Sequence, residues 1–160
     1  MGNYVANNEH FEHARIIFKN FAGEKGDFNR AGDRSFCVVI DDIDQANRMI
    51  EDGWNVKIKQ PRDEGDRPSY HLEVKVSFDP YPPQIYLVAG ESEPKEITED
   101  TVHTLDFAEI KYVDLTIKPY NWEVNGKSGV KAYCKTMYVV IEQDRFAHKY
   151  KNFNDEPMPF

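Results

Sequence analysis

Lysine and aromatic side chains alternate near the end of the chain, in a pattern suited to binding an unpaired nucleic-acid strand. Successive side chains of a β-strand point to opposite faces, so Lys131, Tyr133 and Lys135 would share one face. Ammonium groups contact phosphates, and aromatic rings stack on unpaired bases at about 1 to 3 kcal/mol per base. The residues that we expect at the centre of such a groove are Tyr120, Trp122, Lys127, Lys131, Tyr133 and Lys135.

The same pattern has a plainer interpretation. Tryptophan and tyrosine are common in any sheet, so Trp122 and Tyr133 need have no role in binding. The lysines would in that case form an ordinary solvated face. The hairpin segment alone leaves both interpretations open. Four cations elsewhere in the chain are secondary candidates for contact with nucleic acid: Arg30, Arg34, Lys57 and Lys59.

The last ten residues have the composition of a segment that another molecule recognises. Asp155 and Glu156 supply negative charge, and Pro157 and Pro159 prevent helix formation and strand pairing. Phe160 places an apolar ring beside the terminal carboxylate, which suits a basic pocket with an apolar floor. A frayed chain end of accidental composition is the alternative. The predicted partner-binding residues are Asp155, Glu156, Pro159 and Phe160.

Three carboxylates form a pattern that also occurs at catalytic metal sites. Asp41, Asp42 and Asp44 follow an apolar stretch that ends at Ile40. Carboxylates at a strand end can hold Mg²⁺ in a nuclease or resolvase. At a helix N-terminus they instead cap free amide groups and favour the helix dipole. We favour the cap, because no distant carboxylate or lysine completes a metal set, and we predict no catalytic residue and no metal site.

The net charge of −8 argues against a nucleic-acid partner only until its distribution is considered. Residues 79–110 contain eight Asp and Glu against one Lys. Residues 111–139 contain five Lys against two acidic residues. A locally basic groove can therefore lie on an acidic protein.

Length and composition indicate a cytoplasmic globular protein. A chain of 160 residues is a usual size for one domain, and no apolar run approaches the roughly 18 residues that span a membrane. The N-terminus lacks the basic start and apolar stretch of a secretory signal. Cys37 and Cys134 lie singly within apolar stretches, as expected of buried free thiols in a reducing compartment.

Alternating hydrophobicity predicts the sheet that must position these side chains. Residues 1–13 are expected to form an irregular arm, and a change of phase between residues 110 and 117 predicts a bulge, which lets a sheet curl into a barrel. Residues 125–129 are rich in types that accept positive φ and predict a turn. The expected strands cover residues 14–18, 36–40, 54–58, 70–78, 84–88, 110–117 and 130–141.

Two short helices are expected beside this sheet. Asp42 can cap a helix that stops at Gly53, with an apolar face made of Ile43, Ala46, Met49 and Ile50. A second short helix is expected over residues 98–105. We divide the chain into one domain over residues 1–150 and a flexible tail over the residues that follow.

The segment from Tyr120 to Tyr133, with the sequence YNWEVNGKSGVKAY, resembles the late hairpin of phage-encoded single-stranded DNA-binding proteins. The block from Asn29 to Phe36 is similar to proteins of the same kind. The acidic tail ending on Phe160 resembles the C-terminal tip of bacterial and phage members. The expected fold class is mainly β: an OB-fold-like Greek-key barrel with one or two short helices and a flexible C-terminal tail.

The resemblance implies a protein that is not an enzyme and that needs no cofactor. Such a protein coats and protects single-stranded DNA during phage DNA replication or recombination, in the cytoplasm of the bacterial host. Its tail recruits replication and recombination proteins, it contacts no membrane, and a homodimer is one of the oligomeric states left open. Two alternatives remain: an Mg²⁺-dependent nuclease or resolvase that uses Asp41, Asp42 and Asp44, and a phage adaptor or inhibitor that binds a host protein through its acidic surface.

Overall fold

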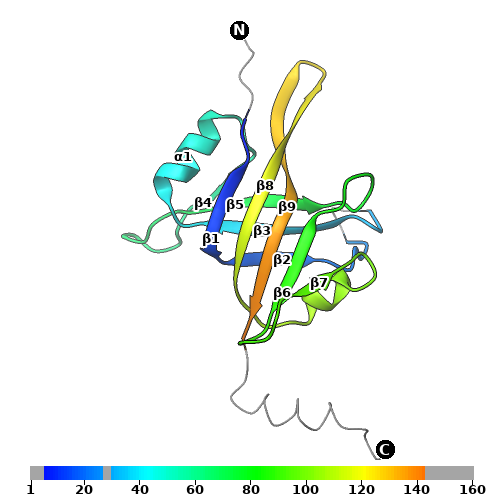
Figure 1. Ribbon diagram of the computed structural model, residues 1–160. Coiled ribbons are helices and arrows are strands. Elements are labelled where there is room, and N and C mark those ends of the chain that lie inside the picture. The colour runs from blue at the N-terminus through cyan, green and yellow to red at the C-terminus, as the bar shows by residue number, and fades with distance from the viewer. Residues whose placement is uncertain (1–5, 27–29, 143–160) are drawn as a thin grey trace, which may run out of the picture.

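The computed structural model describes residues 6–26 and 30–142 (Figure 1). In this part of the chain, a nine-stranded sheet accompanies one α-helix and one short 3-10 helix. The elements are β1 (Glu9–Ala14), β2 (Ile16–Asn20), β3 (Arg34–Ile40), α1 (Ile43–Glu51), β4 (Lys57–Lys59), β5 (Ser69–Val76), β6 (Gln84–Val88), β7 (Lys95–Ile97), η1 (Val102–Asp106), β8 (Ile110–Val124) and β9 (Lys127–Ile141). Over the same ranges, no helix has both the length and the apolar character needed to cross a membrane.

The sheet is open and strongly curled, and its two end strands follow one another in the chain; we call this curled sheet the barrel. The main strand order is β1-β8-β9-β5-β3-β2, and only Arg15 separates β1 from β2 in the chain. β5 and β9 run parallel, whereas the other neighbours in this order are antiparallel. In Figure 1, β1, β8, β9 and β6 cross in front of β5, β3 and β2. These features confirm the predicted fold class, which is mainly β and OB-fold-like, with one α-helix.

Apolar side chains from both layers fill the barrel. Phe36 of β3, Leu72 of β5 and Ile117 of β8 are among the fully buried side chains. Burying a side chain of this size stabilises the fold by roughly 1.5 to 3 kcal/mol. Because strands alternate, the residues between these buried positions point outward and are free to bind a ligand.

Helix α1 begins and ends as predicted. The Asp42 side chain accepts hydrogen bonds from two amides of the first turn, and Gly53 follows the last turn with a φ of 95°. The prediction for its apolar face is partly wrong, because Ile43 and Ile50 are exposed. Only a narrow stripe of the helix, which includes Met49, is buried against the barrel.

The prediction of an irregular N-terminal arm over residues 1–13 is wrong from residue 9 onward, because residues 9–14 form β1 and pair with β8. Two features of this strand prevented it from being recognised by its apolar pattern. One inward position is occupied by a charged residue, Glu9, and the register shifts between Phe11 and Ala14. Each feature breaks the apolar alternation by which a strand is recognised.

Bulges in β8 and β9 shape the second half of the sheet. The register shifts next to Ile110 confirm the predicted change of phase in β8. A second bulge leaves Lys135 of β9 without a partner on β8. Beyond this bulge the buried and exposed faces of β9 are exchanged, so that Met137 is buried and Tyr138 is exposed. Unbroken alternation along the strand predicts that Tyr138 shares the apolar face of Val130 and Cys134, and the bulge makes this prediction wrong.

Candidate nucleic-acid interface

β8 and β9 continue beyond the barrel as a long hairpin, drawn in yellow and orange in Figure 1. Asn125 and Gly126 form its turn, with φ angles of 51° and 80°. Positive φ at both central residues is what a two-residue type I′ turn requires, and Asn-Gly is its preferred sequence. The turn is shorter than predicted, because β9 already begins at Lys127.

One face of this hairpin carries the aromatic and basic residues in register. Tyr120 lies opposite Lys131, and Lys118 lies opposite Tyr133. Trp122 lies opposite Gly129, where an added Cβ would be 3.0 Å from the indole ring. The glycine therefore lets the indole lie close over β9.

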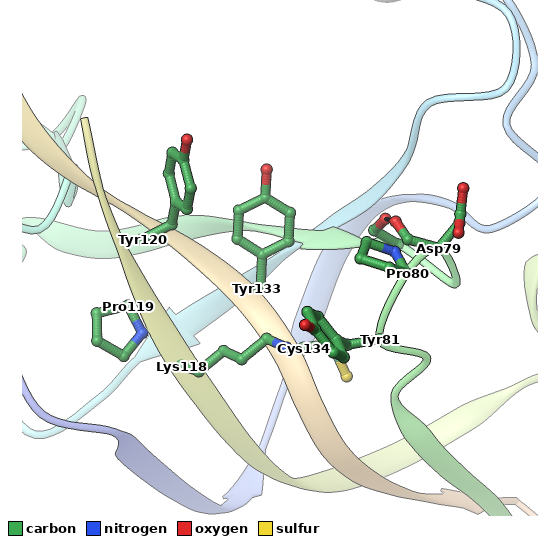
Figure 2. A pocket seen from close by; sticks show the side chains of 9 residues that line it. Asp79, Pro80, Tyr81, Lys118, Pro119, Tyr120, Tyr133 and Cys134 are labelled. Atoms are coloured by element: carbon green, nitrogen blue, oxygen red, sulfur yellow. Dashed lines mark hydrogen bonds between the residues drawn. The ribbon is translucent and has the colours of Figure 1, made fainter. Parts of the chain in front are cut away.

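Three tyrosines gather where the hairpin meets the barrel (Figure 2). The rings of Tyr120 and Tyr133 lie 5.8 Å apart between centroids and meet edge to face. Tyr120 is 56% exposed and Tyr81 is 75% exposed. The Lys118 ammonium lies 5.7 Å from the centre of the Tyr81 ring. These residues line a pocket of about 330 Å³, with Pro80 and Pro119 on its walls.

A second pocket, of about 260 Å³, adjoins the first, and the two share Ser77, Asp79 and Tyr133. Lys75, the neighbour of Tyr133 on β5, lies in it together with Arg34. We call the two pockets together the tyrosine groove. The groove also contains carboxylates, so its positive charge is local rather than continuous: Asp33, Asp79 and Glu99.

Arg34 is held at the far end of the tyrosine groove. Its Nε donates a 3.0 Å hydrogen bond to the carbonyl oxygen of Phe21. Its guanidinium carbon lies 5.7 Å from the centre of the Phe78 ring. These two contacts fix the direction of the side chain, and the planar guanidinium keeps further donors for a phosphate.

The two cysteines offer no nucleophile. Burial raises the pKa of the Cys134 thiol to about 12, although the Lys118 ammonium opposes the shift. Burial and the Glu73 carboxylate raise the pKa of Cys37 to about 11. Both thiols are free, as predicted, but Cys37 is only half-buried. Since the thiolate is the reactive form, both are inert at neutral pH.

The structure brings some of the predicted groove residues together and leaves others apart. Tyr120, Tyr133 and Arg34 line the tyrosine groove. Three lie farther out on the hairpin or at the β9 bulge, and all three are exposed: Lys127, Lys131 and Lys135. Three lie elsewhere: Arg30 in the loop before β3, and Lys57 and Lys59 on β4. Asp155, Glu156, Pro159 and Phe160 lie outside the described residues.

Three groove residues with a side chain suited to contacting a base or a phosphate were not predicted: Lys75, Tyr81 and Lys118. Tyr81 stands between prolines in the segment from Asp79 to Pro83, and a tyrosine in such a loop cannot belong to a regular strand. That signal was available in the sequence. The contribution of Lys75 depends on the parallel pairing of β5 with β9, which the sequence does not reveal.

Of the three aspartates considered for a metal site, Asp42 caps helix α1. Asp42 Oδ1 accepts hydrogen bonds from the amides of Asp44 and Gln45, at 3.0 and 3.2 Å. Asp41 and Asp44 are exposed. Over residues 6–26 and 30–142, no group of three His, Cys, Asp or Glu side chains is arranged to hold a metal ion.

Residues 3–157 match the model of a protein family described as "Putative phage ssDNA-binding domain". Solved structures of the single-stranded DNA-binding protein from bacteriophage Enc34 share the fold. The one in complex with ssDNA has a TM-score of 0.55 at 11% identity, covering 88% of this chain and 89% of that chain. A C-terminal truncation has a TM-score of 0.55 at 10% identity, covering 86% and 87% of the two chains. No curated protein matches the sequence.

Proposed function

We propose that this chain, which belongs to the phage ssDNA-binding domain family, binds single-stranded DNA in the tyrosine groove. The observation that carries the proposal is the exposure of Tyr120 and Tyr81 beside Tyr133 and Lys118. Rings held in water at the rim of a groove offer stacking surfaces for unpaired bases. The Enc34 protein, whose fold is similar, is in complex with ssDNA in one solved structure.

The binding we propose depends little on sequence. Every base has a face that can stack on a tyrosine, whereas Lys118, Lys131 and Arg34 would contact phosphates, which are the same in every nucleotide. A duplex keeps its bases stacked on one another and offers none to the rings. The groove would therefore prefer single strands.

A titration across a salt series tests the proposal. A labelled dT oligomer is expected to bind tightly at low salt, with a log–log salt slope of about −0.7 for each phosphate contacted. Intrinsic fluorescence from tyrosine and tryptophan is expected to fall as bases stack on the rings. A duplex of the same length serves as the control and should bind more weakly. Absence of binding to the single strand at low salt would contradict the proposal.

The biological role that fits this binding is to coat and protect single-stranded DNA during phage DNA replication or recombination, in the host cytoplasm. The tail would recruit replication and recombination proteins, with Phe160 buried in the partner and Asp155 and Glu156 facing its basic residues. Affinity of these proteins for the full chain, and its loss on removal of Phe160 alone, tests this part of the proposal.

We expect deletion of residues 154–160 to strengthen binding to dT oligomers at low salt. The tail carries carboxylates that mimic phosphate and compete weakly for the basic groups of the tyrosine groove. A full-length variant with Asp155→Asn and Glu156→Gln is the matched control, since it keeps the length and loses the charge. It should behave like the deletion. Unchanged or weaker binding in both variants would rule out the competition.

A further inference from the structure

A bulge in β2 exposes a phenylalanine on the surface of the barrel. Phe18 and Lys19 together face one residue of β3, and the Phe18 ring is 73% exposed. Phe18 has a φ of 53°, a left-handed conformation that costs an ordinary residue about 1 to 2 kcal/mol. The Lys19 ammonium donates to the carbonyl oxygens of Leu105 and Ala108, at 2.9 and 2.8 Å, and anchors the bulge. Strained residues and bulges of this kind concentrate at binding sites, where they direct a side chain.

The Phe18 ring lies beside His71. The two ring centroids are 6.2 Å apart, with planes at 72°. In the sheet, β3 separates β2 from β5, so the contact passes over β3. Val39, which pairs with His71, is buried but does not belong to the barrel core. Phe18 and His71 therefore form an aromatic surface on the outside of the sheet.

Two lysines of β4 lie on the same face of the sheet as His71. Lys57 pairs with His71, and Lys59 pairs with Ser69. Residues directly opposite on paired strands have Cβ atoms about 4.5 to 5.5 Å apart, so the Lys57 side chain starts next to the imidazole. Both lysines are exposed, and in the described ranges neither has an ion-pair partner.

We propose that Phe18, His71, Lys57 and Lys59 form a second subsite for single-stranded DNA. An unpaired base stacks on the Phe18 ring, and the adjoining phosphates contact the two lysines. The inference rests on the proposed function, because it extends the path of the same strand beyond the tyrosine groove. It explains why the fold keeps a large apolar ring in water, in a backbone conformation that disfavours it.

The outer face of β5 connects the two sites. Lys75, which lines the tyrosine groove, and His71 are four residues apart on this strand, about 13 Å at 3.3 Å per residue. Glu73 lies between them, and the Lys75 ammonium is 3.3 Å from its carboxylate, which offsets the repulsion that a passing phosphate would meet. An OB fold contacts roughly 4 to 16 nucleotides, so one strand can reach both sites.

The test compares variants of Phe18 in the full chain, using a dT oligomer of about 16 nucleotides. Phe18→Ala and Phe18→Leu are both expected to weaken binding at least about fivefold, because leucine keeps the apolar volume but loses the stacking ring. Phe18→Trp should restore binding, and DNA should quench more indole fluorescence than in the unmodified chain, which already contains Trp54 and Trp122. The matched control is Phe107→Ala, which removes another exposed ring, in the loop after η1, and should leave affinity unchanged.

The outcomes separate this inference from the proposed function. If the Phe18 variants bind like the unmodified chain while loss of Tyr120 and Tyr133 weakens binding, the second subsite is wrong and the tyrosine groove stands. If neither set of variants changes affinity, the proposed function fails as well. A Phe18→Leu variant that binds normally would show that only apolar packing matters, and would also overturn the stacking role.

The lysines have an independent readout. Replacing Lys57 and Lys59 by glutamine should reduce the steepness of the salt dependence by about 1.4 log units per log unit of salt, since each single-strand phosphate contact contributes about 0.7. Lys95→Gln with Lys111→Gln is the control, because it removes the same charge from exposed lysines on β7 and β8. If both pairs change the slope equally, the lysines of β4 contact no phosphate and act only through net charge.

Discussion

A chain in which Tyr120 and Tyr133 are both replaced by alanine is expected to bind single-stranded DNA at least about 30-fold more weakly. Loss of one base–aromatic stack costs about 1 to 3 kcal/mol, so the loss of two corresponds to about 2 kcal/mol or more. The effect of the two substitutions need not be the sum of the single effects, because the rings touch each other at 5.8 Å between centroids. Fluorescence anisotropy with a labelled dT oligomer, on the double variant and both single variants, measures the affinity and this coupling.

Tyr138→Ala is the matched control for the groove tyrosines. It removes an exposed tyrosine from the same strand, beyond the bulge at Lys135 and outside the tyrosine groove. Its ring is stacked on Tyr86 at 5.1 Å, so the substitution also costs one aromatic contact, as in the test variant. Affinity should stay the same. If Tyr138→Ala weakens binding as much as the double variant does, then tyrosine content and not the groove governs affinity.

The hairpin illustrates what the sequence predicts reliably. Asn125 and Gly126 accept positive φ, and the residues on either side alternate between polar and apolar, so local chemistry alone indicates two strands and a tight turn. The placement of Tyr120 and Tyr133 on one face follows from the same alternation. Helix α1 is equally local, because Asp42 and Gly53 mark its two ends without reference to the rest of the fold.

The rest of the candidate site depends on contacts between distant segments. Tyr81 reaches the tyrosine groove through a loop whose path no periodic pattern specifies, and Lys75 reaches it through parallel pairing with β9. Phe18 points outward because of a bulge. A bulge exchanges the inward and outward faces of a strand, and no sequence pattern identifies it reliably. Where bulges and long-range pairing place a residue, alternation along one strand cannot predict its neighbours.

The ion pair between Glu9 and Arg48 joins β1 to α1, and its loss should destabilise the fold. Arg48 donates two hydrogen bonds to the Glu9 carboxylate, at 2.7 and 2.9 Å. The Glu9 side chain is 7% exposed and that of Arg48 is 53% exposed. Removing one partner of a fully buried pair costs about 3 to 5 kcal/mol. Because solvent screens the arginine, we expect Arg48→Ala to lower the free energy of unfolding by about 1 to 3 kcal/mol at pH 7, measured by urea denaturation.

The pH dependence identifies the source of this loss. Burial raises the pKa of Glu9, but hydrogen bonds from Arg48 and Gln45 outweigh it and leave the pKa below its usual range. A lowered pKa contributes stability that is present above the unfolded value of about 4.3 and is lost as pH falls through the folded value. In Arg48→Ala, fewer interactions oppose the effect of burial, so the pKa of Glu9 is higher than in the unmodified chain. As the pH falls, Glu9 is therefore protonated earlier, and the buried charge without its main partner disappears. The difference in stability should therefore be largest near pH 7 and shrink toward pH 4.

Adding Glu9→Gln to Arg48→Ala provides the decisive comparison. If Arg48→Ala lowers stability because it leaves the buried Glu9 carboxylate without its main partner, removing the charge of Glu9 should recover stability at pH 7. It should also abolish the pH dependence that Arg48→Ala adds. Gln45, which donates to Glu9 Oε1 at 3.3 Å, can still donate to the amide oxygen of the new side chain. A double variant as unstable as Arg48→Ala at every pH would mean that the charge of Glu9 contributes nothing to holding the helix against β1. The arginine would then stabilise α1 through packing along its stem or through its contact with Asp52 at 3.9 Å.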